Sequence, residues 1–187
     1  MALMKTPICE FDKQAVDFDL PGVDGRRWTL ADCRGERATL VMFICNHCPY
    51  VKAIRERLLS DVRLLQKDGV GCIAIMPNDP TDYPEDSFDN MKKTAQQWDF
   101  PFPYLLDETQ DVARAYGAVC TPDFFGYNAD LKLQYRGRLD SSGMQPAPPD
   151  APRELVQAMQ SIARTGRGPD VQTPSMGCSI KWINSGH

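Results

Sequence analysis

The alternation of apolar and polar stretches predicts two buried strands with a helix between them. Residues 38–45 (ATLVMFIC) and 70–76 (VGCIAIM) are continuous apolar runs with the length of strands buried on both faces. The segment between them can begin a helix at Pro49 and end it at Asp68-Gly69. Its apolar stripe at helical spacing consists of Val51, Ile54, Leu58, Val62 and Leu65.

Shorter elements are expected around this unit. Paired strands are expected within 16–30, and at 123–127 with 131–136 around the turn 128–130. Helices are expected at about 86–98, 110–116 and 153–164, whereas 101–109 is expected to be irregular. This order predicts an α/β domain with a mixed sheet that helices cover on both faces.

The chain length of 187 residues suits one domain with a core and a modest tail. We predict a domain over residues 1–165 and a C-terminal tail over 166–187, preceded by a proline-rich connector at 141–152. The tail has little pattern and is expected to wrap the surface or to be mobile. The first residues carry no apolar signal-peptide region, and no apolar run is long enough to span a membrane, so a cytoplasmic location is expected.

Charge and cysteine usage narrow the function classes. The net charge of −4 and the absence of a basic run disfavour nucleic acid and anionic membranes as partners. The chain has seven cysteines, an odd number, which in a reducing compartment favours catalysis, redox sensing or metal binding over a disulfide scaffold. Cys72, inside an apolar run, is expected to be a core residue, whereas nothing decides the roles of Cys9 and Cys33.

The candidate chemistry lies in VMFICNHCPYVK, residues 41–52. Cys48 is expected in the first turn of the helix, where free backbone N–H groups and the helix dipole favour a thiolate. Lys52 follows one turn later, and Cys45 lies near the end of the strand. Cys45 and Cys48 have the spacing of a C-x-x-C redox pair. Either Cys45 is the first cysteine of that pair, or Cys48 is the first cysteine of a pair whose usual second cysteine is missing.

This stretch resembles the strand-to-helix junction of thioredoxin-fold proteins. Matching the strand and Lys52 places Cys48 on the nucleophilic first cysteine, His47 on the usual tryptophan and Val51 on the usual second cysteine. Two further segments, DFDLPGVDGRRWTLADCRG (17–35) and AYGAVCTPDFFGYNADLKLQYRG (115–137), resemble the peroxiredoxin-like, or redoxin, superfamily of alkyl hydroperoxide reductases and thiol-specific antioxidants. The resemblance implies a thioredoxin-like fold with an extended N-terminal segment and no cofactor or metal.

The resemblance also implies roles for individual residues. Pro122, after Thr121, matches a proline that is typically cis and packs beside the nucleophile, so both residues are expected to contact substrate. His47 either stabilises the thiolate or shuttles a proton, or it is only a partly exposed ring. Three cysteines remain as partners that could resolve oxidised Cys48: Cys45, Cys120 and Cys178.

The implied function is thiol-disulfide oxidoreduction with Cys48 as the nucleophile. The substrate is expected to be a disulfide-containing protein, a small thiol compound or a hydroperoxide, the reductant an unidentified thiol, and the chain is expected to be able to form a homodimer. One alternative is a hydroperoxide reductase, although the threonine and proline of its P-x-x-x-T-x-x-C motif are replaced here by Cys45 and Val41.

A second alternative is a copper carrier with Cys45, His47 and Cys48 as ligands. Such carriers also use a distant histidine, and the other histidine of this chain is His187.

Overall fold

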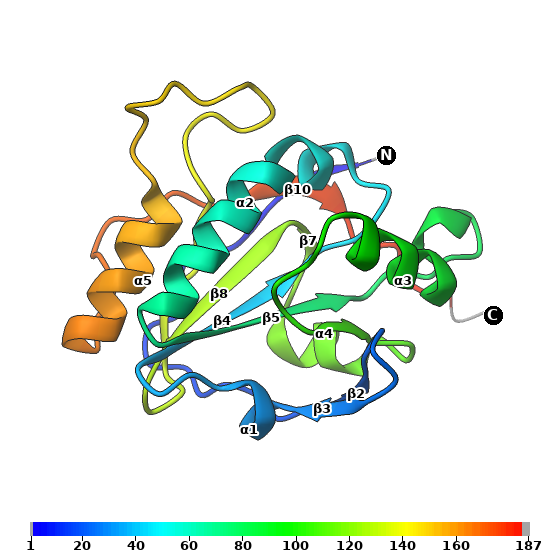
Figure 1. The fold of residues 1–187 in the computed structure, drawn as a ribbon, viewed down its shortest axis with the longest axis horizontal. Coiled ribbons are helices and arrows are strands. Elements are labelled where there is room, and N and C mark those ends of the chain that lie inside the picture. The colour runs from blue at the N-terminus through cyan, green and yellow to red at the C-terminus, as the bar shows by residue number, and fades with distance from the viewer. Residues whose placement is uncertain (1, 185–187) are drawn as a thin grey trace.

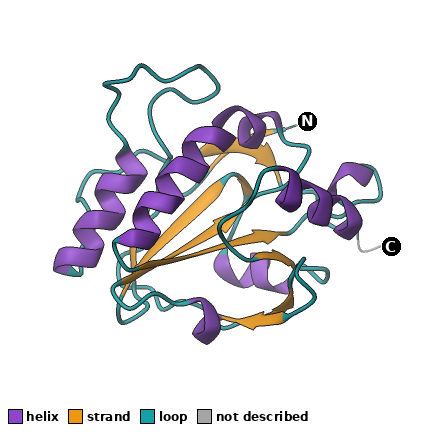
Figure 2. Ribbon diagram, viewed as in Figure 1, coloured by secondary structure: helices purple, strands orange, loops and turns teal. Residues whose placement is uncertain are grey.

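The computed structural model describes residues 2–184, which form a central sheet with helices around it (Figure 1, Figure 2). The helices are α1 (Leu30–Cys33), α2 (Pro49–Lys67), the 3₁₀ turn η1 (Pro84–Asp86), α3 (Phe88–Gln97), α4 (Asp111–Tyr116) and α5 (Glu154–Thr165). The strands are β1 (Leu3–Lys5), β2 (Asp19–Pro21), β3 (Arg27–Thr29), β4 (Ala38–Phe43), β5 (Val70–Met76), β6 (Tyr104–Leu106), β7 (Cys120–Thr121), β8 (Asp123–Asn128), β9 (Leu133–Tyr135) and β10 (Met176–Ser179).

The central sheet is mixed and has the strand order β6-β5-β4-β8-β9. β4 pairs in parallel with β5 and antiparallel with β8, and β5 continues in parallel to β6. Every side chain of β4 is buried, because both faces of the sheet are covered. The predicted strands at 38–45, 70–76, 123–127 and 131–136 are all present, the first as Ala38–Phe43 and the last as Leu133–Tyr135.

Helices cover both faces of this sheet, as predicted. Leu40 and Met42 point to one face and pack in a hydrophobic cluster with α2 and α5, which lie side by side in Figure 1. Val41 and Phe43 point to the opposite face, where they pack with α1, α4 and the β2-β3 hairpin. The alternation along β4 therefore divides the core into two layers.

The long helix α2 begins and ends at the predicted residues. Pro49 is its first residue, where the missing N–H costs nothing, and Cys48 is the N-cap. The chain leaves the helix through Gly69, whose φ of +83° suits glycine. The whole predicted stripe from Val51 to Leu65 is buried against the sheet, so packing of this face fixes where the helix N-terminus lies.

The C-terminal tail contains a strand that the sequence pattern does not reveal. β10 lies between β1 and β7 in a separate three-stranded antiparallel sheet. Figure 1 shows β10, in red, beside the N-terminal half of α2. Of the two alternatives for the tail, wrapping the surface or being mobile, mobility does not hold for residues 176–179, which form this paired strand. The division into a domain over residues 1–165 and a tail over residues 166–187 stays a prediction.

Other differences concern short elements. The segment 101–109, expected to be irregular, contributes the edge strand β6, and β1, β7 and α1 were not predicted. Each of these elements has four residues or fewer, too short to show a hydrophobic period. Among the described residues, no helix combines the length and apolar character needed to cross a bilayer.

Candidate active site

Cys48 occupies the N-cap of α2 and is completely buried. Its Sγ lies 3.2 Å from the carbonyl oxygen of Thr121 and 2.9 Å from Sγ of Cys178. The Thr121–Pro122 peptide bond is cis, as the resemblance implies. The site thus joins three elements that are distant in sequence: the start of α2, the end of β7 and the middle of β10.

Cys178 is brought to Cys48 by the register of the small sheet. Cys178 pairs with Thr121, and Ser179 pairs with Cys120. Directly paired residues of antiparallel strands project to the same face, so Cys178 shares the face of Thr121. Among the three candidate partners, Cys178 has its sulfur 2.9 Å from that of Cys48.

Cys45 lies just beyond β4 and is buried behind Cys48. Its Sγ is 3.3 Å from the hydroxyl oxygen of Thr121 and 3.7 Å from Nδ1 of His47. Its thiol also serves as a hydrogen-bond donor to the sulfur of Cys48. The Cys45 thiol therefore acts on the pKa of Cys48.

The three thiols of the site have different pKa values. The pKa of Cys48 is lowered to about 5, first by the hydrogen bond from Cys45, against the effect of burial, and further by hydrogen bonds from Cys178 and from the backbone N–H of Val51. Burial raises the pKa of Cys45 well above its ordinary value, and burial together with the hydrogen bond to Cys48 raises that of Cys178 to about 12. At neutral pH the array therefore holds one thiolate, on Cys48, between two protonated donors.

The side chain of Cys120 points in a different direction from that of Thr121. As the neighbour of Thr121 on a strand, it projects to the other side of β7, and its Sγ lies 3.6 Å from the carbonyl oxygen of Pro122. Burial, and then the nearby Asp123 carboxylate, raise its pKa. Among the described contacts, no hydrogen bond joins Cys120 to Cys48.

His47 is buried rather than partly exposed. Its Nδ1 is hydrogen-bonded to Asp86, and its ring stacks on Tyr83 with centroids 4.4 Å apart. Its Nε2 is buried and has no hydrogen-bond partner among the described residues. The imidazole is therefore held from one side by a carboxylate and on one face by an aromatic ring.

Asp86 is the site residue that the sequence reasoning missed. Asp86 belongs to an acidic segment, residues 79–89, but is itself fully buried at the end of η1. Its Oδ1 accepts the backbone N–H groups of Asn46 and His47 at 2.8 and 3.1 Å, and its Oδ2 accepts the Asn78 side-chain amide at 3.0 Å. Burial by itself raises the pKa of Asp86, but the hydrogen bonds from His47 and Asn78 outweigh it and lower the pKa.

The carboxylate of Asp86 therefore fixes the loop that carries the cysteines. Tyr104 adds a hydrogen bond of 2.8 Å from its hydroxyl to the Asn46 side chain. In the sequence, Asp86 differs from its exposed acidic neighbours only in its tertiary contacts, and no local signal could have singled it out.

One group of side chains has the composition of a metal site. Single ligand atoms of Cys45, His47 and Asp86 lie within 4.8 Å of one another, and all three residues are buried. The group shares Cys45 and His47 with the predicted copper ligands but has Asp86 in place of Cys48. His187, the predicted distant histidine, lies outside the described residues.

The remaining cysteines lie away from these contacts. Cys72 is buried within β5, as expected for a core residue, and Cys33 is buried at the end of α1. Cys9 is half-buried in the N-terminal segment. Burial raises the pKa of all three thiols, which therefore resemble packed side chains more than nucleophiles.

Comparison with known proteins concerns the family and the fold of the chain. The model of the AhpC/TSA family matches residues 11–138. An uncharacterized conserved protein from Geobacillus kaustophilus is 44% identical, with a TM-score of 0.93 over 100% of this chain and 99% of its own. A hypothetical protein from Sinorhizobium meliloti is 34% identical, with a TM-score of 0.87 over 97% of this chain and 98% of its own.

A thiol:disulfide interchange protein of the thioredoxin family from Chlorobium tepidum is 16% identical, with a TM-score of 0.62 over 81% of this chain and 97% of its own. At this identity the likeness shows the fold alone. No curated protein matches the chain. The predicted resemblance to redoxins and the thioredoxin-like fold are confirmed.

Proposed function

Because the chain belongs to the AhpC/TSA family, we propose that it is a thiol-disulfide oxidoreductase in which Cys48 is the nucleophile and Cys178 the resolving cysteine. The observation that carries the proposal is the 2.9 Å separation of the two sulfurs. A disulfide bond is about 2.05 Å long, so the pair can close with a small movement. The lowered pKa of Cys48 supports its role, since the thiolate is the attacking form.

The reaction has two exchange steps. The Cys48 thiolate attacks one sulfur of a disulfide RSSR, the S–S bond breaks, RS⁻ leaves and takes up a proton, and Cys48–S–SR forms. The sulfur of Cys178 then attacks the Cys48 sulfur, loses its proton to the second RS⁻, and closes the Cys48–Cys178 disulfide. RSSR is reduced to two thiols, and the protein pair is oxidised by two electrons. A thiol reductant must reopen the pair before the next cycle.

The neighbouring residues support these steps. Cys45 donates to the thiolate and lowers its pKa, a role that needs no disulfide of its own. His47, held by Asp86, contacts Cys45 and sets the position of that donor. Thr121 and Pro122 border the sulfur of Cys48 through the Thr121 carbonyl and the cis bond. We assign no step to Cys120, whose thiol faces away.

Trapping the intermediate tests the proposal. Reduced protein is mixed with glutathione disulfide, quenched with acid and analysed by intact-mass and peptide mass spectrometry. We expect wild-type protein to pass through glutathionylated Cys48 to the Cys48–Cys178 disulfide, Cys178→Ser to stop at the mixed disulfide, and Cys48→Ser to form neither. Cys72→Ala, which removes a buried thiol remote from the site, should behave as wild type. A disulfide from Cys48 to Cys45 or Cys120 would refute the role of Cys178.

Reduction of hydroperoxides is a second candidate, favoured by the same low-pKa thiolate beside a second thiol. Here Cys48 attacks ROOH and becomes a sulfenic acid with release of ROH, and Cys178 condenses with it to a disulfide and water. Hydrogen peroxide added to the Cys178→Ser variant should leave sulfenic acid on Cys48. Oxidation no faster than that of a free thiol would exclude this activity.

Copper carriage is supported only by the grouping of Cys45, His47 and Asp86. Asp86 is a hard ligand that copper(I) does not prefer, and its hydrogen bond to His47 must be replaced on binding. Titration of the reduced protein with copper(I) tests this candidate. Absence of binding excludes copper carriage, and binding by His47→Ala with the same affinity as the wild type excludes this group of residues as the site. The cytoplasmic location and a homodimer stay predictions.

A further inference from the structure

The sheet edge beside the cis proline is already occupied by this chain's own tail. Residues 119–121 use their backbone to pair with β10, with Cys178 opposite Thr121 and the N–H of Ile180 donating to the carbonyl of Val119 at 3.2 Å. An extended polypeptide that approached Cys48 by strand addition would need those same backbone groups. β10 therefore takes the place of an incoming chain.

β10 is held in this place along its whole length. Its other edge pairs with β1, and after it Lys181 accepts the backbone N–H of Asp79 at 2.8 Å and the Gln110 side-chain amide at 2.8 Å. Gly177 packs so closely on Thr121 that an added Cβ would lie 2.0 Å from its carbonyl oxygen. Displacing β10 would break all these contacts, so the site stays closed to a polypeptide strand.

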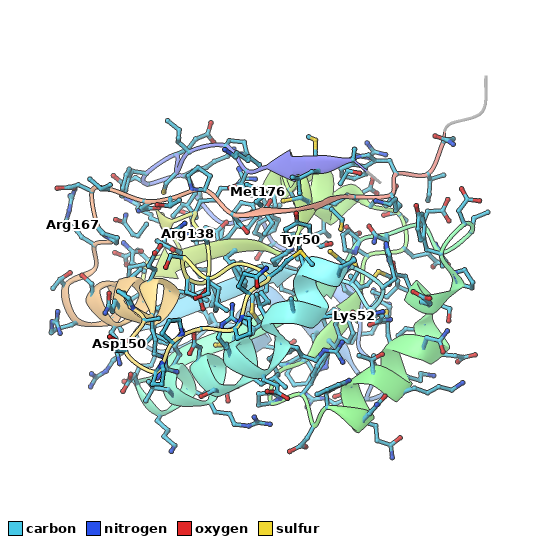
Figure 3. The ribbon with its side chains drawn as sticks, turned by 90° about the horizontal axis from the view of Figure 1, so that it is seen from above. Tyr50, Lys52, Arg138, Asp150, Arg167 and Met176 are labelled. Carbon is cyan, nitrogen blue, oxygen red and sulfur yellow. The ribbon has the colours of Figure 1, made fainter. Side chains whose placement is uncertain are left out.

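A cleft beside the cysteine pair remains open. Its volume is about 360 Å³, within the range of small-molecule sites. It lies between the first turns of α2, the residues after β9 and the start of β10, and Figure 3 shows Tyr50, Met176 and Arg138 in this region. Its apolar lining consists of Tyr50, Ile54, Pro122, Phe124, Leu139 and Met176.

The cleft lies next to the residues that carry the two sulfurs. Pro122 follows Thr121, whose carbonyl contacts Cys48, and Tyr50 is two residues after Cys48. Met176 and Cys178 are two residues apart on β10 and project to the same face. Cys48 and Cys178 themselves are buried and do not line the cleft, so its lining residues adjoin the cysteine pair from one side.

The charges at the cleft are largely neutralised. Arg138 is paired with Glu154 at 2.8 Å, and Asp140 is paired with Arg57 at 2.8 Å. Lys5 lines the cleft and has no ion-pair partner among the described residues. The lining thus favours a ligand with an apolar body and disfavours one with a positive charge.

We propose that the cleft binds the apolar body of a low-molecular-weight disulfide and presents its sulfurs to Cys48, and that polypeptide disulfides are excluded by β10. This inference rests on the proposed function and names the substrate class of the same site. The substrate disulfide is reduced to two small thiols through the two exchange steps given above, with Cys48 and Cys178 becoming the oxidised pair.

The test compares single-turnover oxidation of reduced protein by dithiodipyridine, a small aromatic disulfide, and by insulin, a polypeptide disulfide. Each rate is divided by that of the same disulfide with mercaptoethanol, which removes the intrinsic reactivity. We expect the normalised rate with insulin to be lower by about tenfold or more, a difference of about 1.4 kcal/mol in the barrier.

Two matched variants test the cleft itself. Met176→Arg places a charged chain in the cleft, whereas Met4→Arg makes the same change at a residue of similar exposure on β1, opposite Gly177 and outside the cleft lining. We expect Met176→Arg to slow oxidation of the protein by dithiodipyridine about tenfold or more, because apolar contact with the disulfide is lost. Met4→Arg should retain the wild-type rate. Thermal melts of both variants verify folding.

The outcomes separate the two proposals. If neither disulfide oxidises Cys48, the proposed function itself is overturned. If both disulfides react at equal normalised rates, or if the two arginine variants have the same rate with dithiodipyridine, only the small-molecule inference is overturned, and thiol-disulfide exchange at Cys48 stands.

Discussion

Replacing Gly177 by alanine should separate the two exchange steps. The added Cβ would lie 2.0 Å from the Thr121 carbonyl oxygen and 2.6 Å from its carbonyl carbon, whereas an ordinary contact begins at 3.4 Å. Relieving the clash with the oxygen moves the two backbones apart by about 1.4 Å. Both contacting atoms belong to backbone, so no flexible side chain can absorb the change.

This displacement increases the distance between the two reacting sulfurs. Cys178 follows residue 177, and its sulfur would move from 2.9 Å to roughly 4 Å from that of Cys48. A misplacement of about 1 Å can slow a positioned reaction by about a hundredfold. We therefore expect closure of the Cys48–Cys178 disulfide to slow by about this factor. Formation of the first mixed disulfide should change less, because Cys45, the main cause of the low pKa of Cys48, stays in place.

Rapid acid quench after mixing with glutathione disulfide, followed by intact-mass measurement, gives both rates. The variant should accumulate glutathionylated Cys48, and its free energy of unfolding should fall by about 1–3 kcal/mol, as expected for overpacking. Met4→Ala, on the strand opposite Gly177, serves as the control. A folded Gly177→Ala protein that closes the disulfide at the wild-type rate would refute the assigned packing.

Three further predictions concern the thiolate and its support. Cys45→Ala should raise the pKa of Cys48 from about 5 toward the ordinary thiol value, measured by thiolate absorbance against pH; an unchanged pKa contradicts the donor role of Cys45. The pKa of Cys48 is lower in the folded protein than in the unfolded chain, so the free energy of unfolding of the reduced protein should rise from about pH 5 to about pH 8.5 and fall again as the pH is lowered. In denaturant titrations, Cys48→Ser should show a shallower dependence of this free energy on pH. Asp86→Asn, which leaves His47 without its carboxylate, should lower the free energy of unfolding by about 3 kcal/mol or more, and a loss within about 0.5 kcal/mol would contradict its role in the loop.

The sequence was most informative where local pattern and tertiary structure agree. The buried stripe of α2 and the proline at its start place Cys48 at a helix N-terminus without any knowledge of the fold. The family resemblance adds the cis bond before Pro122, which local physics alone does not require. Together they define the nucleophile and one wall of its site.

The other site residues, Cys178 and Asp86, are positioned by contacts between segments that are far apart in the sequence. Cys178 is recruited by β10, a strand of four residues whose partners come from the N-terminus and from β7, so its role has no local signature. Asp86 likewise has the sequence environment of an exposed acidic loop, and only its hydrogen bonds to residues 46 and 47 reveal its burial. Backbone pairing and burial of this kind are properties of the folded chain, not of a sequence window.

The distance between the two cysteines along the chain has a consequence for biosynthesis. Cys178 follows Cys48 by 130 residues, and its strand is bound between residues 3–5 and residues 120–121. A ribosome adds about 5–20 residues each second, so Cys48 waits several seconds or more before its partner is made. During this interval the nascent chain has the helix start and Cys45 but lacks the strand that closes the site. Protection of this cysteine against disulfides and oxidants is therefore completed only after residue 178 has been made.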